Sequence, residues 1–196
     1  MKLVFESDRL VFRPVAEADL DLAIEQWTDP DVVKYTADRT YTEEELAAEM
    51  PIIIRRCAGG CIGIWCLLDA VTEEKLGSVF LLPMPTELDD TDWELMVGEQ
   101  IPEGDIEIGY VLKKSAWGKG YATEACKRLL KFAFEESPLE EIVAVIDTEN
   151  VASRKVAEKS GLIYEGPVRA YSGTYPGFRI TRQQWTQDNT LVDETN

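Results

Sequence analysis

Residues 106–134 read IEIGYVLKKSAWGKGYATEACKRLLKFAF, and the pattern changes from strand to helix through a glycine loop. Ile106–Leu112 is an apolar run of strand length, and the residues from Ala122 to Glu135 repeat at helical spacing. One face of the expected helix is formed by Ala122, Ala125, Cys126, Leu129 and Ala133. The stretch therefore predicts a strand, a glycine turn and an amphipathic helix in succession.

The glycine turn has the chemistry of an anion site. Glycines at a strand-to-helix turn let the backbone approach a ligand closely, and the first N–H groups of the helix, together with its dipole, bind an anion such as a pyrophosphate. A Walker A loop is excluded because Lys119 is followed by Gly120. A dinucleotide loop is a weak match because Thr123 stands where the third glycine belongs and the turn lies mid-chain. A glycine helix cap without a ligand stays open as an alternative.

The rest of the chain alternates strand and helix patterns, with no internal repeat or low-complexity linker. Strands are expected at Arg9–Val15, Ile62–Leu68, Leu76–Leu82, Glu141–Ile146, Leu162–Glu165 and Phe178–Trp185. Helices are expected at Ala18–Trp27, Thr42–Cys57 and Asn150–Lys159. The second and third strands are split by the polar turn DAVTEEK, which predicts an antiparallel hairpin.

This order of elements predicts the fold class. Strands dominate the first half and strand–helix–strand order dominates the second, which indicates one α+β domain with a mixed sheet and a central parallel element. The domain is expected to span residues 1–185, with a flexible tail at 186–196. Thr42 and Glu45 form a capping-box pattern at the start of the second helix.

The charge of the chain restricts its partners. Its 196 residues include 37 acidic and 20 basic ones, a formal net charge of −17. Such a field repels phosphate backbones and anionic lipid, so binding to nucleic acid or to a membrane surface is disfavoured. A cationic or amine-bearing partner is favoured instead, although the charge also has a bland explanation in solubility.

The absence of histidine restricts the chemistry. It removes Ser-His-Asp and Cys-His machinery and histidine metal sites, so acid–base work falls to carboxylates, tyrosine, lysine, cysteine or water. The four cysteines, at positions 57, 61, 66 and 126, form no CxxC pair; we expect buried free thiols and no metal site. The first residues lack the apolar core of a signal peptide and no apolar run is long enough to span a membrane, so a cytoplasmic protein is expected.

A long connection, Pro83–Asp105, contains eight acidic residues and no basic one. Connections of this length are commonly lids or binding loops. Two interpretations stay open, a solvated loop and a loop that faces a cationic acceptor.

Two segments resemble a known family. The stretch at 106–134, followed by VIDTENVASRKVAEKSGLIYEG at 145–166, strongly resembles the GNAT superfamily of acyl-CoA-dependent N-acetyltransferases. Within it, SDRLVFRPVAEADL at 7–20 and WTDPDVVKYT at 27–36 are similar to the group that includes the ribosomal-protein N-terminal (Rim-type) acetyltransferases. The resemblance covers roughly Ser7 to Trp185. It implies a single-domain GNAT-like fold, with a mostly antiparallel sheet, a central parallel strand pair and flanking helices.

The resemblance implies that acetyl-CoA is the cosubstrate and assigns residues to it. In the family, the backbone amides of the glycine turn wrap the pyrophosphate of coenzyme A, and the end of the preceding strand pairs with the pantetheine and supplies an oxyanion donor. The first residue of the turn is commonly Gln or Arg in the family, whereas this chain has Trp117. The matching positions are Tyr110, Val111, Leu112, Trp117, Gly118, Lys119, Gly120, Tyr121 and Ala122.

Asn150 and Ser153 match family positions near the pantetheine and the sulfur. Without the family, Asn150 is interpreted as a helix cap and Ser153 as filler. Glu107 matches the position of a carboxylate base in many relatives, and burial between the strands would raise its pKa toward neutrality. Its alternative is a solvent-facing strand residue. Many relatives place a tyrosine acid where this chain has Ala157, so three alternatives stay open: Ser153 as the proton donor, a bound water as the donor, or a thiolate that leaves unprotonated.

The resemblance implies direct attack of an amine on the thioester within a ternary complex. We expect an N-acetyltransferase acting on a protein N-terminus or a small cationic amine, as a monomer or a homodimer. The C-terminal segment YSGTYPGFRITRQQW, in which Arg179 and Arg182 stand out, departs from the group's usual ending, so the acceptor is not carried over. Two alternatives stay open, a nucleotide-binding protein with the same turn and a non-catalytic module that binds or senses acyl-CoA.

Overall fold

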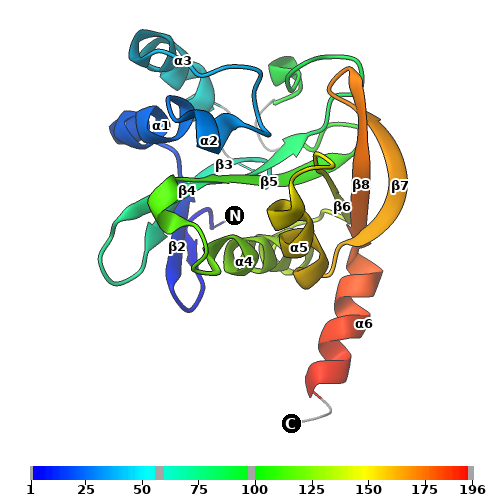
Figure 1. The fold of residues 1–196 in the computed structure, drawn as a ribbon. Helices are drawn as coiled ribbons and strands as arrows, with labels where there is room; N and C mark the ends of the chain where they lie inside the picture. Colours follow the sequence, from blue (N-terminus) through cyan, green and yellow to red (C-terminus); the bar gives the residue numbers. More distant parts are fainter. Residues whose placement is uncertain (1, 56–59, 97–99, 194–196) are drawn as a thin grey trace.

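The computed structural model describes residues 2–55, 60–96 and 100–193, and its centre is one eight-stranded sheet (Figure 1). The strands are β1 (Phe5–Glu6), β2 (Leu10–Pro14), β3 (Gly63–Asp69), β4 (Lys75–Pro83), β5 (Ile106–Leu112), β6 (Glu141–Val145), β7 (Ile163–Ala170) and β8 (Gly173–Thr181). The helices are α1 (Leu20–Trp27), α2 (Pro30–Val33), α3 (Glu43–Arg55), α4 (Tyr121–Glu135), α5 (Val151–Lys159) and α6 (Arg182–Asp193), with 3-10 turns at Glu17–Asp19, Trp93–Leu95 and Lys114–Ala116.

The strand order is β1-β2-β3-β4-β5-β6-β8-β7. Every neighbouring pair is antiparallel except β5 and β6, which run parallel at the middle of the sheet. The predicted mixed sheet with a central parallel pair is therefore confirmed, as is the predicted hairpin, now β3 and β4.

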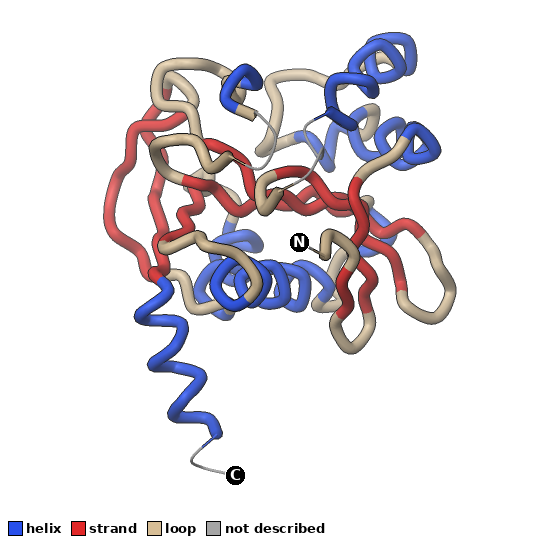
Figure 2. The backbone as a smooth tube through the Cα atoms, turned by 180° about the vertical axis from the view of Figure 1, so that it is seen from behind, coloured by secondary structure: helices blue, strands red, loops and turns tan. Residues whose placement is uncertain are grey.

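Helices cover both faces of the sheet. Figure 1 shows α4 and α5 below the sheet and α1, α2 and α3 above it, and Figure 2 shows the same layers from behind, with α6 projecting from the body. The main core lies between the sheet and α4, where Leu129, Phe132 and Ala133 are fully buried. A second core, around Leu22 and Met50, lies under α1 and α3.

Local signals explain several element boundaries. The Thr42–Glu45 capping box is present: the Thr42 backbone N–H donates to Glu45 Oε2 (2.8 Å) and the Glu45 backbone N–H donates to Thr42 Oγ1 (3.2 Å). The helix that follows ends at Arg55, and its expected end at Cys57 lies outside the described residues. The other three cysteines, Cys61, Cys66 and Cys126, are buried free thiols.

The C-terminal part differs from the expectation. The predicted strand Phe178–Trp185 is wrong in its second half: β8 ends at Thr181, and α6 occupies the last four positions and continues into the expected flexible tail. The helix begins there because Thr181 and Gln184 form a reciprocal cap, in which the Thr181 N–H donates to Gln184 Oε1 (2.8 Å) and the Gln184 N–H to Thr181 Oγ1 (3.3 Å). The expected strand Leu162–Glu165 is longer than predicted and forms a hairpin with β8.

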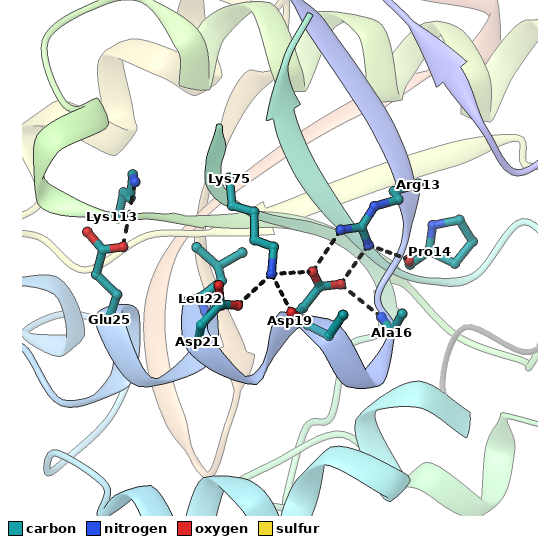
Figure 3. A network of polar contacts seen from close by, with 10 residues as sticks. Arg13, Pro14, Ala16, Asp19, Asp21, Leu22, Glu25, Lys75 and Lys113 are labelled. Carbon is teal, nitrogen blue, oxygen red and sulfur yellow. Dashed lines mark hydrogen bonds and ion pairs between the residues drawn. The ribbon is translucent and has the colours of Figure 1, made fainter. Parts of the chain in front are cut away.

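A charged network fastens α1 to the sheet (Figure 3). Asp19, 2% exposed, accepts two hydrogen bonds from the Arg13 guanidinium (2.6 and 2.7 Å), one from the Ala16 N–H (2.9 Å), and pairs with Lys75 (3.2 Å). Burial raises the pKa of Asp19, but these donors outweigh it and lower that pKa to about 2. The network thus joins the start of α1 to β2 and β4.

Candidate active site

The sheet opens at its centre. β4 and β5 pair along their length, from Pro83–Ile106 to Gly77–Leu112, whereas β5 and β6 share the single pair Glu107–Val143. Within residues 2–55, 60–96 and 100–193, no strand therefore pairs with the β6 side of the carboxyl-terminal half of β5, which holds Tyr110, Val111 and Leu112. A strand edge of this kind accepts an extended ligand through main-chain hydrogen bonds.

The glycine turn presents unpaired amides. Gly118 and Gly120 adopt positive φ (73° and 82°), which is why glycine is required there, and Gly120 caps α4 without a side-chain hydrogen bond. Among the hydrogen bonds of the described residues, none is donated by the backbone N–H groups of residues 120–123. A Cβ added at Gly118 would meet nothing within 4 Å, so the turn is open on that side. These features fit a pyrophosphate group.

Distant residues hold the turn in place. Arg9 donates to the Lys119 carbonyl (3.1 Å) and forms an ion pair with Glu124 of α4 (2.6 Å). Trp117 Nε1 donates to the Leu112 carbonyl (2.8 Å), and Tyr121 Oη to Asp69 Oδ2 (3.1 Å). Sequence reasoning missed Arg9 and Glu124, because no local pattern links positions that are 115 residues apart.

Helix α1 also reaches β5. Gln26, 2% exposed, donates through Nε2 to the Val111 carbonyl, and Lys113, just after the strand, pairs with Glu25 (3.5 Å) and Glu74 (2.8 Å). Figure 3 shows Glu25 and Lys113 beside the Asp19 network. The end of β5 is therefore fixed from the α1 face of the sheet.

The structure brings Tyr110, Ser153 and Asn150 together. The Tyr110 hydroxyl donates to Ser153 Oγ (2.9 Å), and the Ser153 backbone N–H donates to Asn150 Oδ1 (3.1 Å), so Asn150 caps α5. Burial raises the pKa of Tyr110, and its hydroxyl stays protonated at neutral pH. Ser153 of α5 thus has a defined hydrogen-bond partner on β5.

Glu107 is buried, not solvent-facing. It is 6% exposed; Oε2 accepts from the Tyr171 hydroxyl, and Oε1 lies 3.5 Å from the Val145 backbone N. Burial raises the pKa of Glu107 to about 7, and the two donors only partly oppose this rise. Both forms of the carboxyl are populated near neutral pH, which suits a general base.

The acidic connection is partly neutralised by arginines. Glu87 pairs with Arg169 (2.6 Å), and Asp105 receives both Nη atoms of Arg179 (2.9 and 3.0 Å). A pocket of about 250 Å³ opens in this connection, lined by residues 83–88 with Asp92 and Leu95. Positions 97–99 of the connection lie outside the described residues.

The arginines of the C-terminal segment have structural partners. Besides Asp105, Arg179 contacts Glu165 (2.9 Å) and Glu141 (3.1 Å). Arg182 donates to the carbonyl groups of Ser137 (2.8 Å) and Leu139 (2.7 Å). These contacts join β8 and the start of α6 to their neighbours.

Over residues 2–55, 60–96 and 100–193, no group of three or more His, Cys, Asp or Glu side chains is placed to hold a metal ion. None of the helices in this part of the chain is long and apolar enough to cross a membrane.

Comparison with known proteins identifies the family. Residues 9–163 match the model of the acetyltransferase (GNAT) domain. The chain is 28% identical to an uncharacterized N-acetyltransferase, p20, of Bacillus licheniformis over 166 residues, covering 84% of this chain and 85% of the relative. It is also 28% identical over 186 residues to FsC-acetyl coenzyme A-N(2)-transacetylase of Aspergillus fumigatus, covering 90% and 75%.

The solved structures agree on the fold. The aminoglycoside acetyltransferase AAC(6')-Ib in complex with coenzyme A superposes with a TM-score of 0.70 at 20% identity, covering 91% of this chain and 98% of that one. The Rim-type likeness is partial, since a putative ribosomal N-acetyltransferase, YdaF of Bacillus subtilis, is 41% identical over only 63 residues, covering 32% of this chain and 34% of the relative. The expected fold and the acetyl-CoA cosubstrate are confirmed.

Proposed function

The chain belongs to the GNAT acetyltransferase family, and from this premise we propose that it transfers the acetyl group of acetyl-CoA to a primary amine by direct attack in a ternary complex. The acceptor is a protein N-terminus or a small cationic amine. The observation that carries the proposal is the buried carboxyl of Glu107. It has a pKa of about 7 and lies on β5 at the last residue pair before β5 and β6 separate.

The donor side is proposed to use main-chain groups. The amides of residues 120–123 would bind the pyrophosphate, and the edge of β5 at Tyr110–Leu112, which pairs with no strand on its β6 side within the described chain, would bind the pantetheine. When bound, acetyl-CoA supplies an activated thioester carbonyl. A backbone N–H at the end of β5 would polarise that carbonyl, a role worth about 3 kcal/mol in other acyl-transfer sites.

The acceptor side is proposed to use Glu107 as the base. An amine is mostly protonated at neutral pH and must lose a proton to attack, and Glu107 takes that proton directly or through water. Half-ionised near pH 7, its carboxyl matches the operating pH, which general base catalysis favours.

We propose that Ser153 stabilises the leaving group, the thiolate of coenzyme A. Its hydroxyl is oriented by Tyr110 and stabilises the departing thiolate as a hydrogen-bond donor. Because burial raises the pKa of Tyr110, the tyrosine keeps its proton and orients Ser153 without ionising. Asn150, which caps α5 through the Ser153 N–H, fixes the serine backbone on the same side.

The relatives support an amine acceptor. The name of the Aspergillus relative specifies transacetylation at an N(2) position, and the solved neighbour is an aminoglycoside acetyltransferase. The net charge of −17 favours a cationic molecule. These are reasons for the acceptor class only, because the identities are 28% and 20%.

A thiol-release assay with acetyl-CoA and a panel of polyamines, aminoglycosides and peptide N-termini tests the proposal. We expect turnover with at least one cationic amine, and Glu107→Gln should lower kcat about 100-fold with the acetyl-CoA Kd unchanged by calorimetry. Glu141→Gln, an exposed glutamate on β6, is the matched control and should retain activity. Binding of acetyl-CoA without turnover on any amine would support the sensing module instead.

A further inference from the structure

The hydroxyl group that donates a hydrogen bond to Glu107 belongs to a residue in a distant turn. Tyr171 begins the two-residue connection between β7 and β8, and its hydroxyl donates to Glu107 Oε2, 64 residues earlier in the chain. Tyr171 lies outside residues 9–163, the part that matches the family model. Its role is therefore a matter of this chain's own geometry.

Three main-chain or hydroxyl contacts seat this turn on the acidic connection. The Tyr171 N–H donates to the Pro85 carbonyl (3.0 Å), the Ser172 N–H to the Thr86 carbonyl (3.0 Å), and Ser172 Oγ to the Glu87 carbonyl (3.0 Å). Both turn residues adopt positive φ, 48° and 54°. Non-glycine residues hold such a conformation only when the surrounding contacts determine it.

An ion pair adds to these contacts. The Arg169 guanidinium, at the end of β7, donates to both carboxylate oxygens of Glu87, from Nε to Oε1 (3.0 Å) and from Nη2 to Oε2 (2.6 Å). We name the contacts between residues 85–87 and residues 169–172 the turn clamp. It fixes the backbone from which the Tyr171 side chain reaches Glu107.

We propose that Tyr171 is a positioning residue for Glu107: its hydroxyl orients the carboxylate and stabilises the ionised form that accepts the proton, and the turn clamp holds the hydroxyl there. This inference rests on the proposed function of Glu107. It adds a residue and a mechanism for setting the working pH that the family match does not contain.

The surroundings of Glu107 offer few groups besides the Tyr171 hydroxyl that could stabilise the ionised carboxylate. The two donors to the carboxyl, Tyr171 and Val145, pack against an apolar cluster formed by Met84, Val143 and Ala170, and Val143 is the strand partner of Glu107. Its other donor, the Val145 N–H, is at the outer limit of hydrogen-bond distance, 3.5 Å. Among the described residues, the other titratable groups that act on Tyr171 are Tyr175 of β8 and Asp90 of the acidic connection, and neither acts on Glu107 itself. Neither offers a positive charge, so the Tyr171 hydroxyl is the main stabiliser of the carboxylate.

The test is the pH dependence of kcat/KM in Tyr171→Phe. Loss of the donor disfavours the ionised base, so the acid limb should move to higher pH by about half to one unit. Carbon-13 titration of the Glu107 carboxyl by NMR, in the free protein, should show the same upward shift. Tyr175→Phe, which removes a hydroxyl from the same hairpin and apolar cluster, is the matched control and should leave both midpoints unchanged.

A charge swap gives a second measurement should Tyr171→Phe fold poorly. Arg169→Glu breaks the clamp and should raise the midpoint, and the double variant Glu87→Arg/Arg169→Glu should restore it. Unchanged midpoints in Tyr171→Phe, together with a Glu107→Gln variant impaired about 100-fold, would overturn this inference alone. An unimpaired Glu107→Gln variant would remove the base itself and with it the proposed mechanism.

Discussion

Burial of the Glu107 carboxyl favours its proposed role as a base but lowers the stability of the fold. Glu107 is buried beside apolar side chains and has no cationic partner among the described residues, so its charged form is costly. The same cost raises the pKa of Glu107 to about 7, which suits the proposed role of a base near neutral pH. The property that suits this proposed role therefore lowers the stability of the fold whenever the carboxyl is ionised.

We predict that stability will report this conflict. The pKa of Glu107 is raised from 4.5 to about 7 on folding, so the native state retains a proton that the unfolded state releases between these values. The free energy of unfolding therefore falls as pH rises through that window, by at most about 3 kcal/mol. Glu107→Gln lacks this loss, so urea unfolding should show the variant gaining on the wild type between pH 5 and pH 8.

The exposed-strand variant Glu141→Gln is the control, and its stability relative to the wild type should change little over the same range. A difference between Glu107→Gln and the wild type that is the same at both pH values would contradict a raised pKa for Glu107.

At the residue scale, the sequence and the family resemblance predicted Glu107 as the base and predicted its burial, but not its hydrogen-bond partners. The absence of histidine favours a carboxylate, and the resemblance selects the position on the central strand. The contact with Tyr171 could not be predicted from the sequence, because it joins positions 64 residues apart and depends on how the last hairpin folds back. The hydrogen bond between Tyr110 and Ser153 was also missed, because it joins positions 43 residues apart.

At the scale of elements, the backbone conformation of the glycine turn is what suits it to the proposed ligand. Gly118 and Gly120 need positive φ, and this conformation leaves the amides at the start of α4 without partners in the described chain. The Arg9–Glu124 pair fixes the turn from the β2 side. These contacts hold the turn in place within the protein itself, which would reduce the entropy lost on binding the proposed ligand.

We predict that Gly118→Ala raises the KM for acetyl-CoA about tenfold and also costs about 1 kcal/mol of stability, because alanine resists positive φ. Gly104→Ala is the matched control: Gly104 also has positive φ (104°), and a Cβ there likewise meets nothing within 4 Å. It should lose stability while keeping the KM. Steady-state kinetics and thermal unfolding measure both effects, and equal KM changes in the two variants would refute the role of the turn.

Elements with a regular period were predictable, and irregular turns were not. β5, α4 and the β3–β4 hairpin follow from apolar spacing, and α3 begins at its capping box. The β7–β8 hairpin was missed because its turn is Tyr-Ser, whereas the usual signal for two positive φ values is Asn or Gly. The start of α6 carried a readable signal, Thr181 with Gln184 three positions later, which the strand prediction overlooked.

For the whole molecule, the net charge of −17 acts at long range. Glu87 and Asp105 of the acidic connection are paired with Arg169 and Arg179, so these two carboxylates contribute little net field. Attraction of a cation must come from the summed charge of the protein. Such attraction is screened by salt over about 10 Å at 0.1 M.

We predict that kcat/KM for a polyamine falls about tenfold as ionic strength rises from roughly 0.01 to 0.5 M, because steering is screened. A neutral amine acceptor, measured at a pH where it is uncharged, should show a much weaker dependence. A flat response for the polyamine would mean that the net charge serves solubility alone.

The architecture was predictable at this scale because the order of strands and helices restricts the possible sheets. The single pair joining β5 to β6 was not, since the separation of two strands depends on side chains from several elements. The Asp19 network likewise joins three segments that no local pattern relates.

The turn clamp also has a consequence for the order of events during synthesis. A domain generally folds as a unit, and β8 of this one pairs with both β6 and β7, so the sheet is incomplete until the last hairpin has been synthesised. Tyr171 reaches Glu107 only after β7 and β8 have left the ribosome and the turn has closed on residues 85–87. A nascent chain that ends before β8 therefore lacks the contact proposed to position Glu107, even though the glycine turn, α4 and α5 have already been synthesised.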